Sequence, residues 1–172
     1  MPRNKRDQDR DAKRDALVAT ARRLFLEDGF EATSMSRLAA AAGVAPNTIY
    51  WYFKDKDEVL VAVLDAEFSA RMGDYLQLRF KDSTERLLWV VDQLELASRL
   101  VSTVHTRMQS SPQVNAWHDR FHAMSEGMMR LEMQQQGLPP ERLEALVKIC
   151  VFTIEGLLAH PLSAADKRAV CE

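Results

Sequence analysis

Apolar residues recur at three- and four-residue spacings along most of the chain, which is the pattern of amphipathic helices. No stretch alternates with the two-residue period of a strand, and no internal repeat is present. Glycine, proline and helix-capping residues divide the pattern into segments. Helices are expected over residues 12–28, 34–42, 45–53, 56–73, 82–94, 99–109, 114–136 and 141–159, with a short one from residue 164. The sequence therefore predicts an all-α fold.

Residues 34–56, SMSRLAAAAGVAPNTIYWYFKDK, predict two short helices joined by a tight turn. Ser34 can cap the first helix, and Gly43 can turn the chain because glycine adopts a positive φ readily. On the second helix Ile49 and Phe53 are four residues apart and should point inward together. A helix–turn–helix of this kind can place the end of one helix in the major groove of DNA.

Polar and aromatic side chains occupy the positions of this segment that should face outward. The candidates for contact with DNA bases or phosphates are Ser34, Arg37, Asn47, Thr48, Tyr50, Trp51, Tyr52 and Lys56. Two positions are unfavourable for capping, since Ala45 has no side-chain acceptor and Arg37 cannot complete a capping box with Ser34. As a bare pattern, such a helical pair also occurs as a packing corner or as a protein-binding element.

From about Ala12 to Leu64 the sequence resembles the DNA-binding domain of the tetracycline-repressor (TetR) family of bacterial regulators. The residues that carry the resemblance, in unbroken spacing, are Gly29-Phe30, Ser34, Ala39, Ala42-Gly43-Val44, Thr48-Ile49-Tyr50, Phe53 and Lys56. The resemblance implies an all-helical homodimer with an N-terminal DNA-reading domain. It also implies a divergent C-terminal domain that usually binds a small molecule.

The resemblance further assigns roles to single residues of the helix–turn–helix. Ser34, Tyr50 and Lys56 would contact DNA phosphates. Asn47 and Thr48 would be the residues that meet base edges. The departures at the two capping positions leave the operator sequence open, while the motif itself is unaffected.

The chain is expected to contain a flexible basic arm (1–11), a three-helix helix-turn-helix DNA-binding domain (12–56) and a C-terminal helical domain for ligand binding and dimerisation (57–172). Its net charge of −2 is unusual for a DNA-binding protein. However, residues 1–14 carry six basic side chains and three acidic ones, a local charge of +3. Such an arm can lie along phosphates or enter a minor groove, or it can be a solvated tail.

The C-terminal part carries large, soft side chains at helical spacing. Candidates for lining a ligand cavity are Trp89, His105, Met108, Trp117, Phe121, Met124 and Met128. Methionine adapts to irregular shapes, and His105, expected on an apolar helix face, would add one polar group. A small apolar or amphipathic ligand would suit this set, while an ordinary protein core is the alternative for each residue.

The stretch LEALVKICVFTIEGLLAH, residues 143–160, is apolar around most of its circumference and must be buried on several sides. Candidates for a dimer interface on it are Val147, Val151, Ile154 and Leu158. The alternative is the central helix of a monomer. Because the sequence ends soon after Pro161, either the final helix is expected to be short or the chain is truncated.

Sequence motifs for other chemistry are weak. His118, His122 and Glu126 recur at four-residue intervals, yet no neighbouring Cys or Asp cluster completes a metal site. No nucleophile elbow, phosphate loop or zinc-protease helix is present, so neither an enzyme nor a cofactor is expected. Cys150 and Cys171 are too far apart in sequence for a redox motif. The charged N-terminus and the lack of a membrane-length apolar run favour a cytoplasmic protein.

Three hypotheses follow, in order of preference. The first is a DNA-binding transcriptional regulator, a repressor that a small-molecule ligand releases from a near-palindromic operator. The second is a helix-turn-helix regulator without a small-molecule effector, controlled by a protein partner or by its own abundance. The third is a metal-dependent enzyme that uses His118 and His122.

Overall fold

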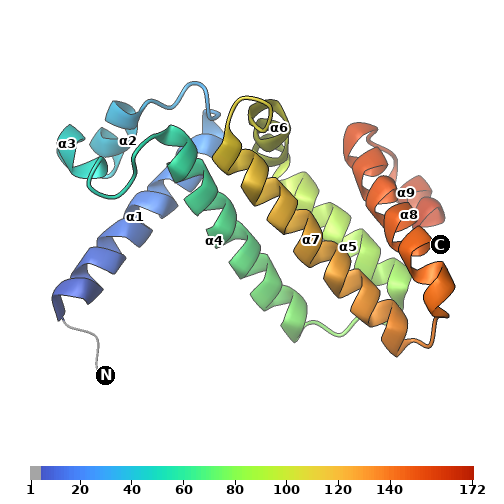
Figure 1. Ribbon diagram of the computed structural model, residues 1–172. Helices are drawn as coiled ribbons and strands as arrows, with labels where there is room; N and C mark the ends of the chain where they lie inside the picture. Colours follow the sequence, from blue (N-terminus) through green and yellow to red (C-terminus); the bar gives the residue numbers. More distant parts are fainter. Residues whose placement is uncertain (1–4) are drawn as a thin grey trace. The chain divides into compact units, whose positions relative to one another are not determined.

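The computed structural model describes residues 5–172, with side chains from residue 8 onward. The described part of the chain is helical and contains no strand, which confirms the predicted all-α fold (Figure 1). The helices are α1 Lys5–Glu27, α2 Met35–Ala41, α3 Pro46–Ile49, α4 Lys56–Gln77, α5 Ser83–Leu96, α6 Ser98–Arg107, α7 Pro112–Gln135, α8 Pro140–Ala159 and α9 Ala164–Cys171. Across these described residues, no helix combines the length and apolar character needed to span a membrane.

The chain folds into two compact units. The first comprises the chain up to Leu76 together with Arg99–Asn115, and so contains nearly all of α1–α4 and α6. The second comprises Gln77–Ser98 and Ala116–Glu172, with α5, α8, α9 and most of α7. The functional division expected between residues 56 and 57 is a different partition and stays a prediction.

The core of the first unit lies between α1, the two short helices α2 and α3, and the first half of α4. Apolar side chains at helical spacing form it because each helix buries one face. On α1 the buried residues are Leu17, Val18, Ala21, Leu24 and Phe25. The rings of Phe25 and Phe30 meet edge to face with centroids 5.2 Å apart, which closes the end of this core.

Two long helices, α1 and α4, extend beyond their predicted ends. α1 begins at Lys5, well before the predicted Ala12. The intervening residues contain no glycine or proline, and the lysine, arginines and glutamine among them favour a helix. Residues 1–4 of the predicted arm lie outside the described residues. α4 continues through Gly73 to Gln77, since an internal glycine costs a helix only about 1 kcal/mol.

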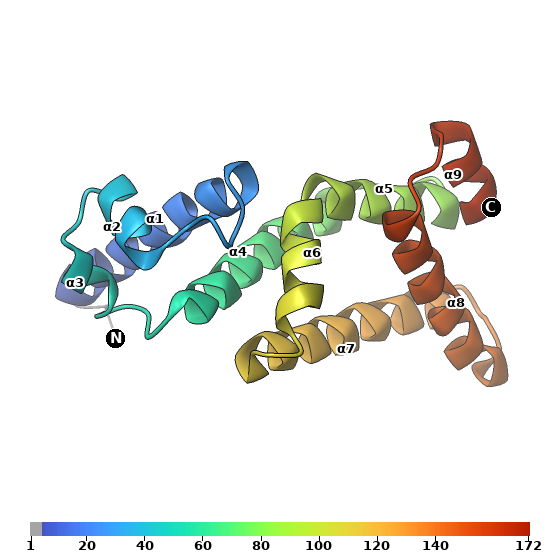
Figure 2. The ribbon, with the colours of Figure 1, turned by 90° about the horizontal axis from the view of Figure 1, so that it is seen from above.

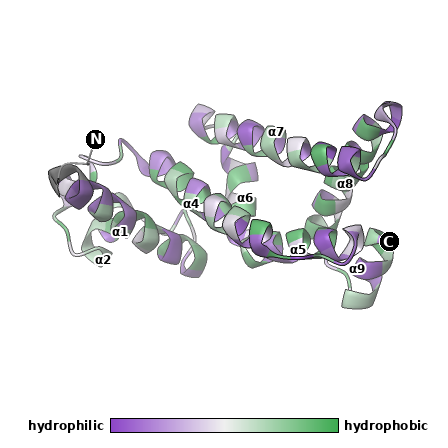
Figure 3. Ribbon diagram, turned by 90° about the horizontal axis from the view of Figure 1, so that it is seen from below, coloured by the Kyte–Doolittle hydropathy of each residue, from purple (hydrophilic) through white to green (hydrophobic). Residues whose placement is uncertain are grey.

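The second unit is built around Val91 of α5 and two residues of α8, Ile154 and Leu157. α5 packs against both α8 and α9, as the view from above shows (Figure 2). α5 starts as predicted, because Asp82 Oδ1 accepts a hydrogen bond from the backbone N–H of Glu85 at 2.8 Å. Most of α8 is coloured as hydrophobic in Figure 3, in keeping with a helix that supplies much of the core.

Candidate nucleic-acid interface

The first helix of the motif, α2, is capped and ended by the predicted residues. Ser34 Oγ accepts a hydrogen bond from the backbone N–H of Arg37 at 3.1 Å. Gly43 has a φ of +68°, and the following Val44 N–H donates to the carbonyl of Ala39 at 3.0 Å. This is the Schellman arrangement, in which a left-handed residue ends the helix. The cap and the turn predicted from sequence are both confirmed.

The second helix, α3, is shorter than predicted. It ends at Ile49, and Tyr50–Tyr52 continue in tight turns instead of reaching Phe53 as helix. Ala45 supplies no capping side chain, and bulky aromatic residues propagate a helix poorly, so little holds a further turn. Pro46 occupies the first helical position, where its missing N–H is harmless.

Two buried side chains, Ile49 and Phe53, anchor the segment that carries the polar and aromatic residues around α3. Above them Tyr50 and Trp51 are 54% and 76% exposed, which is unusual for side chains of this size. Asn47 is also exposed. Hydrogen-bonding groups and aromatic faces on a fixed scaffold are what a DNA-reading element requires.

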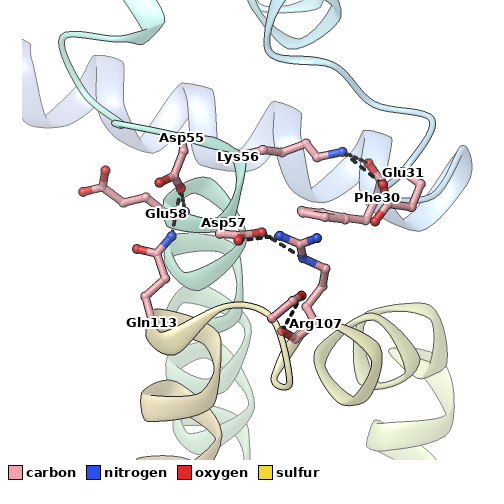
Figure 4. A network of polar contacts seen from close by, with 9 residues as sticks. Phe30, Glu31, Asp55, Lys56, Asp57, Glu58, Arg107 and Gln113 are labelled. Carbon is pink, nitrogen blue, oxygen red and sulfur yellow. Dashed lines mark hydrogen bonds and ion pairs between the residues drawn. The ribbon is translucent and has the colours of Figure 1, made fainter.

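The basic residues of the motif are more constrained than the sequence suggests. Lys56 Nζ lies 4.1 Å from the centre of the Phe30 ring and donates to the Phe30 carbonyl at 2.9 Å (Figure 4). The carboxylate of Glu31 is 3.7 Å from the same nitrogen. Arg37 reaches back to Asp28, with Nη2 2.7 Å from Oδ2. Their proposed phosphate contacts therefore compete with acceptors inside the unit.

Lys54 is a candidate that the sequence analysis missed. It follows the buried Phe53 directly and is exposed, close in sequence to the exposed Tyr50 and Trp51. The sequence has a lysine on each side of Asp55, but only Lys56 matches the family pattern, so Lys54 was not considered.

Behind the motif, α6 and the start of α7 hold the beginning of α4 (Figure 4). The Arg107 guanidinium donates from Nη2 and Nε to the Asp57 carboxylate at 2.6 and 3.1 Å. These bonds raise the pKa of Arg107 above its already high value, so the guanidinium stays charged. Gln113 Nε2 donates to Asp55 Oδ1 at 2.8 Å. No local pattern reveals such pairs, because the partners are fifty or more residues apart.

A model of the bacterial regulatory proteins of the tetR family matches residues 17–63, which span the C-terminal part of α1, all of α2 and α3, and the start of α4. Over this segment the chain matches the TetR family. The family match ends inside α4. It therefore covers the helix–turn–helix and the adjoining parts of α1 and α4, but not the second unit.

Curated relatives agree with this assignment. The chain is 31% identical over 70 residues to the fatty acid metabolism regulator protein of Bacillus subtilis, covering 41% of this chain and 34% of that protein. It is 33% identical over 85 residues to the regulator AcrR of Shigella flexneri, covering 43% of this chain and 40% of the relative. A transcriptional repressor of Mycobacterium tuberculosis is 27% identical over 165 residues, or 90% of this chain and 85% of its own.

Solved structures share the fold of this chain. A transcriptional regulator from Rhodococcus sp. Rha1 superposes with a TM-score of 0.74 at 16% identity, covering 92% of this chain and 91% of that one. A regulator from Saccharomonospora viridis, in complex with choline, gives 0.73 at 18% identity and 94% coverage of both chains. These likenesses confirm the all-helical architecture, with an N-terminal helix–turn–helix and a C-terminal helical domain.

The residues predicted to line a ligand cavity are dispersed, and their role stays a prediction. The rings of Trp117 and Phe121 stack on α7 with centroids 5.3 Å apart, and Met128 is half-buried further along that helix. Met124, by contrast, is exposed. The placement of His105 on an apolar face was wrong, because α6 buries the face of Val104 and turns the next residue toward solvent. Trp89 is half-buried on α5, and Met108 is half-buried just after α6.

The residues predicted for a dimer interface lie in the core of the second unit instead. Val147, Val151 and Ile154 are buried, and Leu158 packs against the cluster around Val91 and Leu157. In this structure they are therefore not available to another subunit. Sequence periodicity could not separate the two faces of α8, because both are apolar. The exposed face carries two large side chains, Ile149 and Phe152, which are 57% and 67% exposed.

The three potential metal ligands on α7, His118, His122 and Glu126, contact other side chains of the protein. The rings of His118 and His122 lie with centroids 4.4 Å apart, and His122 Nε2 is 3.9 Å from Glu155 of α8. Glu126 binds Lys148 Nζ at 2.7 Å and so belongs to an ion pair. In the part of the chain that the structure describes, no three His, Cys, Asp or Glu side chains group to hold a metal ion.

Proposed function

We propose that the protein is a DNA-binding transcriptional regulator, a repressor that binds a near-palindromic operator as a homodimer. The observation that carries this proposal is the exposed pair Tyr50 and Trp51 above the buried Ile49 and Phe53, in a capped helix–turn–helix of the TetR family. One short recognition element reads few bases, so pairing two copies on two half-sites supplies affinity and symmetry.

The proposed signal for release is a small apolar or amphipathic ligand bound by the helical C-terminal part. A similar regulator from Saccharomonospora viridis is in complex with choline, and the stacked Trp117 and Phe121 offer an aromatic surface of the kind that binds such molecules. The ligand would shift the population between a DNA-competent state and an incompetent one. Loss of operator binding on adding a ligand separates this mechanism from control by a protein partner or by abundance.

The test is selection of binders from a random duplex library by the purified protein, with its mass in solution measured alongside. We expect an inverted repeat to be enriched, and the protein to be a dimer. No enrichment at moderate salt, where family-type contacts with phosphates still act, would contradict the proposal. The relatives named above are regulators or repressors, so the metal-dependent enzyme gains no support from them.

The exposed Asn47 is expected to read a base, so Asn47→Ala should change which sequence is preferred. Loss of one amide–base contact costs about 1–3 kcal/mol of discrimination at a single position. Selection with the variant should therefore relax one position in each half-site. Tyr50→Phe is the matched control, since loss of a phosphate contact weakens binding to all duplexes alike. An unchanged preference in the Asn47 variant would refute its base-reading role.

The phosphate role proposed for Lys56 can be measured through the salt dependence of operator binding. Each lost phosphate contact lowers the slope of log K against log salt by about 0.9. Lys56→Ala should give this decrease for each half-site, and Lys54→Ala is the comparison, because Lys54 is the exposed alternative. If Lys56→Ala weakens DNA binding without changing the slope, the Lys56 ammonium binds the Phe30 carbonyl and not a DNA phosphate.

A further inference from the structure

The basic side chains of the first unit fall into two groups, those paired with an acid and those without such a partner. The paired residues are Arg22, Arg23, Arg37, Lys56, Arg71 and Arg107. Among the residues that the structure describes in this unit, the basic side chains without a carboxylate partner are Arg10, Lys13, Arg14, Lys54 and Arg99. Arg99 donates to the carbonyl of Glu27 instead. The other four are available to an anion from outside the protein.

Two of these side chains, Arg10 and Arg14, continue the buried face of α1. Steps of four, three and four residues lead back from the buried Ala21 and Leu17 to Arg14 and Arg10, which keeps all four on one stripe of the helix. Arg14 and Arg10 are exposed, since the core ends before them. The stripe of α1 that packs on the helix–turn–helix therefore changes from apolar to cationic where it leaves the core.

The cationic part of this stripe meets the end of the helix–turn–helix. The Arg14 guanidinium lies 5.2 Å from the centre of the Phe53 ring. Phe53 is buried, and the residue directly after it is the exposed Lys54. A guanidinium over a ring keeps N–H donors for a further acceptor. Arg14 and Lys54 thus lie close to the segment that carries the exposed Tyr50 and Trp51.

The acids in this part of α1 lie on other sides of the helix. At about 100° per residue, Asp9, Asp11 and Asp15 each fall about 60° or more from both arginines around the helix axis. Lys13 is one helical turn from Asp9, so its charge is offset by that neighbour. The net charge of this part of α1 thus conceals a separation of charge, with the two arginines on the side that faces the helix–turn–helix.

We propose that Arg10, Arg14 and Lys54 form a cationic surface that binds phosphates of the DNA backbone beside the bases read from α3. This inference rests on the proposed function and adds the N-terminal turns of α1, outside the family match, to the interface. A guanidinium can bind a phosphate through two parallel N–H donors. Because Lys56 and Arg37 are engaged by Glu31 and Asp28, the motif itself has few other cations to neutralise DNA.

The helical state of the segment makes this contact definite. Arg10 lies in the stretch expected to be a flexible arm, but α1 is continuous from Lys5, so Arg10 is fixed one turn from Arg14. Side chains on a preformed helix lose less conformational freedom on binding than those on a flexible arm. The cationic surface should therefore bind particular phosphates instead of sampling many.

The first experiment measures the salt dependence of operator binding for wild-type protein, Arg10→Gln and Arg14→Gln. Each lost phosphate contact lowers the slope of log K against log salt by about 0.9. We expect this decrease for each half-site in both variants, with unchanged base preference. Arg10→Lys keeps the charge and should retain most of the wild-type slope. Arg10 makes no contact with a described side chain, so its replacement should leave the unfolding midpoint in denaturant unchanged.

Phosphate-ethylation interference on the same operator locates the contact. At least one phosphate whose ethylation blocks the wild type should cease to matter for Arg10→Gln. Arg23→Gln is the matched control, because Arg23 lies on the same helix, is exposed and pairs with Glu27. This variant should keep the wild-type slope and interference pattern.

Three results would overturn the phosphate-binding role while leaving the proposed function intact. The first is a wild-type slope and interference pattern in Arg10→Gln and Arg14→Gln. The second is a relaxed base preference with the phosphate pattern retained, which would assign the arginines to a groove. The third is an equal loss in Arg23→Gln, which would indicate a general effect of charge. Absence of any operator for the wild type would overturn the proposed function and this inference together.

Discussion

Replacing Phe53 by alanine is expected to lower the free energy of unfolding by about 3–5 kcal/mol and to abolish operator binding. The Phe53 ring is buried at the end of the helix–turn–helix, and the Arg14 guanidinium lies 5.2 Å from its centre. Truncation leaves a cavity directly beneath the exposed residues that precede it. Denaturant unfolding followed by circular dichroism measures the change in stability.

The neighbouring Tyr50 provides the control for this prediction. Its side chain is exposed, so Tyr50→Ala should change stability by no more than about 0.5 kcal/mol. Both variants are expected to bind DNA poorly, but for different reasons: one loses the scaffold and the other a contact. Equal stability of the two variants would show that Phe53 does not support the motif.

The helix–turn–helix could be predicted from sequence because local chemistry determines it. A serine cap, a glycine with positive φ and a pair of apolar residues four apart each act over a few positions. Ser34, Gly43, Ile49 and Phe53 all occupy the predicted places. The end of α3 was missed because the pattern of apolar residues continues to Phe53, whereas the backbone N–H groups of Trp51 and Tyr52 already bond to carbonyls three residues back, as in a tight turn.

Contacts between distant parts of the chain could not be predicted in this way. Arg107 and Asp57 pair although they are fifty residues apart in the chain, and the sequence around each of them indicates only a solvated charge. The same limit applied to α8, whose two faces are both apolar. Val147 proved to be buried and Ile149 exposed, and only the packing of α5 against α8 distinguishes them.

Phe152→Glu is expected to convert the proposed dimer to a monomer at micromolar concentration. Phe152 and Ile149 are exposed on the face of α8 opposite to its buried residues, where a second copy would cover them. Large exposed aromatic side chains often act as binding hot spots, and loss of one raises the dissociation constant by about 30-fold or more. A buried, unpaired carboxylate adds to the loss. Sedimentation equilibrium measures the mass, and operator affinity should fall with it.

Leu96→Glu is the matched control, since Leu96 is 77% exposed on α5 of the same unit. Both substitutions add one charge at an exposed apolar position, so general effects on solubility and stability should be equal. Dissociation by Phe152→Glu alone would assign the interface to the outer face of α8. Dissociation by Leu96→Glu alone would place it on α5, and the apolar face of α8 would then need another role.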